Sequence, residues 1–261
     1  MQHVDSSEQK RVSKMQSFYL TDTGRVRSHN EDSVTIVKNA SNEHLMIVAD
    51  GMGGHRAGEI ASSMVVTQIG KRFSEIPTIG TKIDAVNWLK ENIDEVNNNI
   101  LKYGEEHPDS SGLGTTAVMA LLTNEFLMFV NIGDSSGYVL KDQKLHKITK
   151  EHTLVNFLVD TGEITKEEAQ NHPKKNVLMK ALGVSEKIEA DIYDVDPNID
   201  AIMLCSDGLT NMLTKDQIEM VLIDDEISSE EKLIKLIKKC NARGGTDNIS
   251  IAYLVKDSGE M

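Results

Sequence analysis

The apolar positions along the chain change their period several times, and these changes divide it into segments. Three short apolar or β-branched runs bounded by turn residues predict strands over residues 17–21, 33–38 and 44–49. From Glu59 to Phe73, and again from Lys82 to Tyr103, apolar residues recur at helical spacing. The pattern predicts two long helices, each with one buried face, and Gly104 is expected to end the second.

The second half of the chain begins with four apolar runs joined by short connections, which predict an antiparallel meander over residues 115–123, 125–131, 136–140 and 144–148. Residues 150–183 are more polar, and we expect them to form an inserted surface flap with a helix after the Thr165 to Glu168 capping box. Capping boxes at Thr214 and Ser228 predict two further helices. The remaining apolar runs predict strands over residues 189–195, 201–205 and 248–255.

This order of elements predicts an α+β fold. We expect a central β-sandwich of two mainly antiparallel sheets flanked by helices, a four-layer αββα arrangement with the flap inserted. A three-layer doubly wound sheet is the second choice. Residues 1–14 lack periodicity and are expected to form a loose extension, residues 15–256 one domain with the flap at about 150–183, and residues 257–261 a C-terminal tail.

Composition narrows the function classes. Hydrophobic residues make up 39% of the chain and charged residues 26%, and no apolar run reaches the ~18 residues of a membrane span. The opening residues do not resemble a secretion signal, so the expected location is the cytoplasm. Cys205 and Cys240 lie far apart in apolar segments and are interpreted as core residues. The net charge of −13 argues against a nucleic-acid partner and leaves phosphorylated proteins open.

Acidic residues stand at five predicted strand boundaries. The most prominent follows Met46-Ile47-Val48-Ala49, where Asp50 precedes the glycine-rich stretch Gly51-Met52-Gly53-Gly54-His55. The others are at Asp32, Asp134, Asp207 and Asp247. One such acid is more often an Asx turn or a helix cap, but five together favour a metal centre. Oxygen ligands supplied from several strand ends suit Mg²⁺ or Mn²⁺ better than Zn²⁺.

In chain order, six short motifs resemble those of the metal-dependent protein phosphatases, the protein phosphatase 2C or PPM family, of the bacterial type. They are Arg27-x-x-Asn30-Glu31-Asp32, Asp50-Gly51-Met52-Gly53-Gly54-His55, Gly114-Thr115-Thr116, Gly133-Asp134-Ser135, Ser206-Asp207-Gly208-Leu209 and Gly245-x-Asp247-Asn248. The resemblance covers about residues 17–255. Each motif is weak alone, and their shared order and spacing carry the assignment. One departure is Ser136, which stands where this family usually has arginine.

The resemblance implies hydrolysis of phosphoserine and phosphothreonine in proteins, with two core Mn²⁺ or Mg²⁺ ions and a weaker third ion. Asp50 would bridge the two core ions, Asp207 and Asp247 would complete the first, and the Gly51 carbonyl would bind the second. Asp134, with Asp207, would hold the third ion.

The resemblance also implies roles for residues that hold no ion. Arg27 would bind the phosphate through a two-pronged hydrogen bond that lysine cannot reproduce. Glu31 and Asp32 would orient water around the ions, and His55 would protonate the departing serine or threonine oxygen. Implied partners are phosphorylated proteins and an opposing bacterial serine/threonine kinase. We expect a monomer, with no membrane span and no nucleic acid bound.

Other phosphatase classes and other functions can be weighed against the same sequence. A cysteine-nucleophile phosphatase needs arginine six positions after its cysteine, but Asn211 stands there relative to Cys205. Asp194-Val195-Asp196 resembles a haloacid-dehalogenase pair, yet Pro197 follows, and we interpret it as a strand end. The other loop histidines, His152 among them, are interpreted as solvent-facing. The main rival function is a catalytically weak phosphoprotein-binding regulatory scaffold of the same fold; a two-metal nuclease is disfavoured by the acidic charge.

Overall fold

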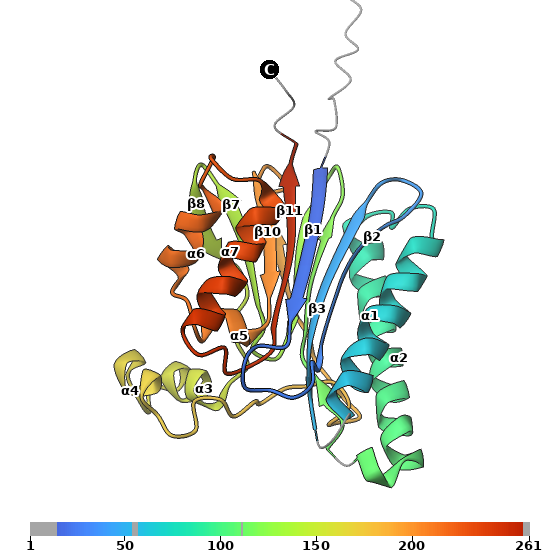
Figure 1. The fold of residues 1–261 in the computed structure, drawn as a ribbon. Coiled ribbons are helices and arrows are strands. Elements are labelled where there is room, and N and C mark those ends of the chain that lie inside the picture. Colours follow the sequence, from blue (N-terminus) through green and yellow to red (C-terminus); the bar gives the residue numbers. More distant parts are fainter. Residues whose placement is uncertain (1–14, 54–56, 111, 258–261) are drawn as a thin grey trace, which may run out of the picture.

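Two antiparallel sheets packed face to face form the centre of the molecule (Figure 1). The computed structural model describes residues 15–53, 57–110 and 112–257. The expected N-terminal extension at residues 1–14 and residues 258–261 of the expected tail lie outside the described residues.

Each sheet combines strands from distant parts of the chain. The six-stranded sheet has the order β2-β3-β5-β6-β9, and β4 pairs with β3. Its strands are β2 (Asp32–Lys38), β3 (His44–Met52), β4 (Gly114–Thr115), β5 (Ala117–Leu122), β6 (Leu127–Ile132) and β9 (Asp191–Val195). The five-stranded sheet has the order β1-β11-β10-β7-β8. Its strands are β1 (Met15–Asp22), β7 (Ser136–Lys141), β8 (Lys144–Lys147), β10 (Ala201–Cys205) and β11 (Ile249–Lys256).

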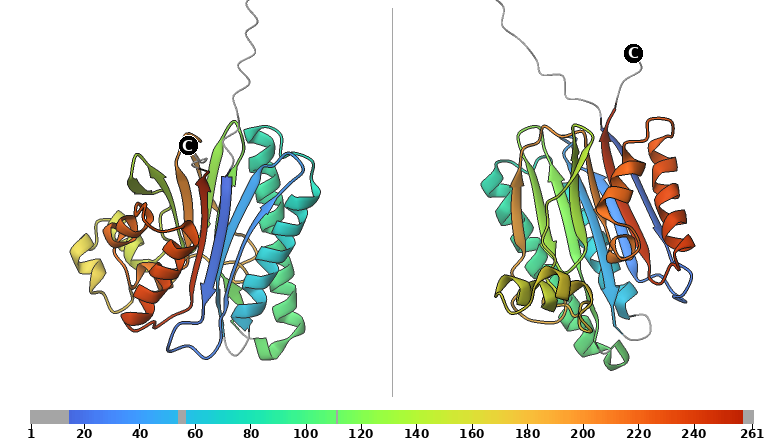
Figure 2. Two further views of the ribbon diagram at one scale, coloured as in Figure 1. Left: turned by 45° about the horizontal axis from the view of Figure 1, so that its top comes forward. Right: turned by 90° about the vertical axis from the view of Figure 1, so that its left-hand side faces the viewer.

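Helices cover the outer face of each sheet (Figures 1 and 2). The six-stranded sheet packs against α1 (Ala57–Glu75) and α2 (Lys82–Glu106). The five-stranded sheet packs against α5 (Asp207–Thr210), α6 (Lys215–Leu222) and α7 (Ser229–Ala242). The expected four-layer α+β sandwich is therefore confirmed. In the part of the chain that the structure describes, none of the helices has the length and apolar character of a transmembrane segment.

Side-chain alternation along the strands explains how the layers form. In β3, Leu45 and Ile47 pack against the outer helices, whereas Met46 and Val48 lie between the sheets. Successive strand residues point to opposite faces, so a strand that is apolar throughout can contribute to both core layers. The same alternation carries Asp50, two residues after Val48, to the inter-sheet side at the end of β3.

Helix starts follow the capping chemistry read from the sequence. Complete capping boxes begin α4 (Lys166–Gln170) at Thr165, α6 at Thr214 and α7 at Ser228, as predicted. The flap also contains α3 (Leu154–Asp160), which was not predicted, and a short 3₁₀ helix (Pro108–Ser110) follows α2. The two cysteines are buried and form no disulfide.

Two predictions about local structure are wrong. The meander over residues 115–148 does not form, because β5 and β6 pair in one sheet whereas β7 and β8 pair in the other. The connection through Gly133, with φ of +107°, carries the chain from one sheet to the other. Gly104 does not end α2, which continues to Glu106 and is capped by His107, whose ring stacks on that of Tyr103.

Two glycines provide a matched test of the packing between layers. A Cβ at Gly137 in β7 would lie 2.7 Å from the Phe129 ring of the opposite sheet, whereas one at Gly70 in α1 would meet Thr35 at an ordinary 3.5 Å. We expect Gly137→Ala to lower the free energy of unfolding by about 1–3 kcal/mol through overpacking. Gly70→Ala should raise it by up to about 1 kcal/mol through helix propensity. Urea unfolding in EDTA measures the free energy of unfolding of both variants. An unchanged free energy of unfolding in Gly137→Ala would contradict this packing.

Candidate active site

The five aspartates expected to form a metal centre lie together at one end of the sandwich. Asp32 at the start of β2 pairs across the strands with Asp50 near the end of β3. Asp207 begins α5 directly after β10, Asp247 precedes β11, and Asp134 lies in the connection from β6 to β7. Burial raises the pKa of Asp50, and the charges of the other four carboxylates raise it further. Both sheets therefore contribute to one acidic site.

Main-chain contacts fix the end of β3. The Asp50 N–H donates to Thr116 Oγ1 at 3.0 Å, and the Asp50 carbonyl accepts from Thr115 Oγ1 at 2.9 Å. Gly51 lies against the start of α1, where a Cβ would be only 2.2 Å from the Gly58 carbonyl oxygen. Glycine at these positions allows the helix and the strand end to approach each other.

A buried chain of hydrogen bonds joins the two sheets beside the site. The Ser206 hydroxyl donates to Asp32 Oδ2 at 2.7 Å, and the Ser250 N–H donates to the Ser206 oxygen at 2.9 Å. Asp32 Oδ1 is buried and has no hydrogen-bond partner among the described residues. Sequence reasoning gave Ser206 no role, although it stands within a quoted motif.

Asn248 is a second residue whose role sequence reasoning missed. Its Oδ1 accepts from the Glu31 N–H, and its Nδ2 donates to the carbonyls of Thr23 and His29, each at 2.9 Å. These bonds fix the loop between β1 and β2 against the start of β11. The only sequence signal was the position of Asn248 directly after Asp247 in the last motif.

Two of the expected ligands hydrogen-bond to neighbouring side chains. Arg27 donates from Nη2 to Asp247 Oδ2 at 2.8 Å, and Asn211 donates to Asp207 Oδ2 at 3.0 Å. Within the described ranges, no three His, Cys, Asp or Glu side chains form a group arranged to hold a metal ion. Arg27 and Asn211 each bond to only one oxygen of the carboxylate that they contact, which leaves further acceptor positions on both carboxylates. His55 lies outside the described residues.

Burial and mutual repulsion make the carboxyl groups hard to ionise. Burial is the largest cause in each case, raising the pKa of Asp32 to about 7, of Asp134 to about 7 and of Asp207 to about 6. The pKa of Glu31 is also raised by burial, and its Oε1 is enclosed without a hydrogen-bond partner in the described part of the chain. Crowded oxygen donors of this kind fit a hard divalent cation, which would replace repulsion with attraction.

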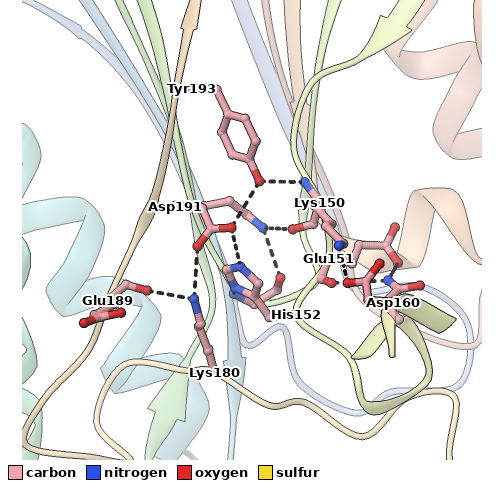
Figure 3. Close-up of polar contacts among 11 residues, drawn as sticks. Lys150, Glu151, His152, Asp160, Lys180, Glu189, Asp191 and Tyr193 are labelled. Atoms are coloured by element: carbon pink, nitrogen blue, oxygen red, sulfur yellow. Dashed lines mark hydrogen bonds and ion pairs between the residues drawn. The ribbon is translucent and has the colours of Figure 1, made fainter. Parts of the chain in front are cut away.

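The base of the flap is fastened beside the site by His152 (Figure 3). The Gly133 main-chain N–H donates to His152 Nδ1 at 3.1 Å, and the main-chain N–H of His152 donates to the Gly133 carbonyl at 2.8 Å. His152 Nε2 lies 3.2 Å from Asp191 Oδ2, and Lys180 Nζ lies 3.0 Å from the other oxygen of Asp191. The interpretation of His152 as solvent-facing is wrong, since only 9% of its side chain is exposed. Gly133 directly precedes Asp134, so the flap and this carboxylate share one anchor.

Comparison with known proteins identifies the family. The model of the family "Protein phosphatase 2C" matches residues 23–246. The serine/threonine phosphatase stp of Listeria monocytogenes is 42% identical over 244 residues, which cover 93% of this chain and 96% of that protein. This chain belongs to the protein phosphatase 2C family.

Solved structures agree with this assignment to the protein phosphatase 2C family. The S. agalactiae serine/threonine phosphatase superposes with a TM-score of 0.88 at 35% identity, covering 94% of this chain and 100% of that one. The catalytic domain of the phosphatase PstP in complex with two manganese ions superposes with a TM-score of 0.80 at 33% identity, covering 92% and 97%. The expected family, fold and enzyme class are confirmed: the chain is a serine/threonine phosphatase of a metal-dependent family, and the scaffold alternative is not favoured.

The raised pKa values predict how the metal-free protein responds to pH. The unfolded chain ionises these carboxyls near pH 4, whereas Asp32 and Asp134 ionise near 7 in the folded protein. The folded state therefore binds more protons between these values, and the free energy of unfolding attributable to these groups falls as pH rises from about 4 to about 7. Denaturant unfolding in EDTA over this range measures the slope.

Asp50→Asn separates this effect from other titrations. Removing the ionisable group should raise the free energy of unfolding of EDTA-treated protein at pH 7, because burial and the neighbouring carboxylates disfavour the charged form of Asp50 and the amide carries no charge. It should also reduce the slope. Asp225→Asn, at an exposed carboxylate between α6 and α7, serves as the control. Equal effects from both variants would contradict repulsion within the acidic site.

Proposed function

We propose that this chain hydrolyses phosphoserine and phosphothreonine in proteins at an Mn²⁺ or Mg²⁺ centre. Asp50, the Gly51 carbonyl, Asp207 and Asp247 would hold two core ions, and Asp134 with Asp207 would hold a weaker third ion. The observation that carries this ligand set is the convergence of carboxyl groups from both sheets at one end of the sandwich, where burial and neighbouring carboxylates raise the pKa values of Asp50, Asp134 and Asp207. All the proposed ligand atoms are oxygens, which Mn²⁺ and Mg²⁺ prefer. A bound cation would take the place of the protons and hydrogen bonds that offset the negative charge of these carboxylates in the metal-free protein.

The surrounding residues divide the remaining tasks. When bound, the cations supply Lewis-acid activation of water and neutralise charge on the phosphoryl group. Arg27 is half exposed and its partner Asp247 is a proposed ligand, so ion binding would free the guanidinium for a bidentate contact to the phosphate. The unpartnered oxygens of Glu31 and Asp32 would accept hydrogen bonds from ordered water and so orient it. His55 would donate a proton to the leaving oxygen, an assignment that rests on the family resemblance.

The proposal also covers the domain bounds, partners, oligomeric state and location of the protein. We assign residues 15–256 to the catalytic domain, with residues 150–183 as its flap. The substrates are phosphorylated proteins, and the opposing enzyme would be a bacterial serine/threonine kinase acting on the same proteins. A monomer in the cytoplasm with a signalling role completes the proposal. These parts are supported by the family resemblance and by composition.

Metal-dependent turnover tests the central claim. With Mn²⁺, purified protein should release phosphate from a phosphothreonine peptide, and EDTA should abolish the release. Asp50→Asn and Asp247→Asn should each reduce kcat/KM by roughly 100-fold or more, because charge neutralisation at the phosphoryl group is lost. Asp225→Asn should retain activity. Turnover that survives EDTA would refute the mechanism, and no turnover with any divalent ion would favour the scaffold.

The proton donor can be tested through the leaving group. A serine or threonine alkoxide needs a proton, whereas p-nitrophenolate leaves without one. His55→Ala should therefore reduce kcat on a phosphothreonine peptide by about 100-fold or more and on p-nitrophenyl phosphate by less than about tenfold. His29→Ala, at an exposed loop histidine of the same region, should change neither rate. Equal losses on the two substrates would remove His55 as general acid.

A further inference from the structure

A cavity of about 770 Å³ lies between the flap and the end of the five-stranded sheet. Asp134 and Asp207 line one part of it, so it is continuous with the candidate active site. The flap contributes apolar side chains from α3 and α4, including Val155 and Ala169. Figure 1 shows these two helices beside α5, on the side of the molecule away from α1 and α2. A volume of this size accommodates several atoms beyond a phosphate group.

The charges that line the cavity divide into paired and unpaired groups. Lys147 pairs with Glu151, and Lys150 pairs with Asp160, so these four groups neutralise one another. Two further carboxylates, Asp134 and Asp207, belong to the proposed ion site. An ion bound there would neutralise them. The charge of the cavity in the working enzyme is therefore set by its remaining lysines.

Those lysines are Lys166 and Lys175, both on the flap. Lys166 is the first residue of α4, whose start is fixed by the Thr165 capping box, and Lys175 lies in the turn beyond that helix. Both side chains are exposed, and neither forms an ion pair with any residue that the structure describes. The net charge of the chain is −13, whereas these two unpaired lysines give this side of the cavity a local positive charge.

We propose that this cavity binds an acidic side chain of the substrate protein, close in sequence to the phosphorylated residue, and that Lys166 and Lys175 determine that preference. The proposal rests on the proposed phosphatase function and narrows its substrate class. Aspartate, glutamate and a second phosphorylated residue share the required negative charge. Ammonium groups on flexible stems suit this task, because they can follow a carboxylate or phosphate whose position varies between substrates.

Matched phosphothreonine peptides test the preference. Each peptide carries glutamate or glutamine at successive positions on either side of the phosphothreonine. At the favoured position, glutamate should lower KM about threefold to tenfold with kcat unchanged, as expected for one or two solvent-exposed ion pairs. The advantage should shrink as the salt concentration rises, because exposed charges are screened. A second phosphorylated residue in place of glutamate distinguishes phosphate from carboxylate recognition.

Charge reversal on the flap identifies the recognising residues. Lys166→Glu and Lys175→Glu should each reduce the glutamate advantage, and the double variant should favour the glutamine peptide. Lys174→Glu is the matched control, because it changes the charge next to Lys175 at a residue that does not line the cavity. None of these four variants should change turnover of p-nitrophenyl phosphate, which has no flanking residues.

Direct binding separates this proposal from the proposed function. Fluorescence anisotropy with non-hydrolysable phosphonate peptides measures the same preference without turnover. If neutral and acidic peptides are hydrolysed and bound equally well, the acidic-side-chain proposal is wrong while the phosphatase function stands. A preference that persists in the double variant would also overturn it. If no peptide is hydrolysed with Mn²⁺ but the lysine-dependent binding preference remains, the phosphatase function fails and the recognition site stands.

Discussion

Repulsion among the carboxyl groups of Asp32, Asp50, Asp134, Asp207 and Asp247 is the constraint that the sandwich has to overcome. Packing of the two sheets and their helices holds these groups together, although Asp32, Asp50, Asp134 and Asp207 would ionise more easily apart. The structure reduces the repulsion through local hydrogen bonds from Ser206, Asn211 and Arg27, and through protonation. A bound divalent cation would relieve the same repulsion, so the crowding that lowers the stability of the metal-free chain is the feature that would favour ion binding.

The site depends on both sheets, and two polar connections keep them in register. Asp32 and Ser206 join the sheets through a buried hydrogen bond, and Asn248 fixes the loop before β2 against the start of β11. None of these three residues is a proposed ligand. Loss of Ser206 or Asn248 would remove a polar contact between segments of the two sheets beside the site and leave its partners without these hydrogen bonds.

Local periodicity predicted most of the fold, and contacts between distant segments account for most of what it missed. The helical patterns and capping boxes located α1, α2, α6 and α7 because those signals are contained within a few turns. Alternation in the strands cannot say which sheet receives them, so the crossing at Gly133 was read as a meander. The role of His152 depends on Gly133 and Asp191, which are far away in sequence. The six motifs identified the acids, but not the partners that Asp207 and Asp247 adopt here.

The fastening of His152 also limits how the flap can move. Its base is held from both ends: His152 bonds to Gly133, and the Met179 N–H, on the segment that leaves the flap, donates to the His152 carbonyl at 2.8 Å. Lys180 adds an ion pair to Asp191 on β9. A pivot must therefore lie beyond these anchors, toward α3 and α4. Displacements large enough to admit substrates of different shape would be confined to the tip that bears Lys166 and Lys175, while the acidic centre keeps its geometry.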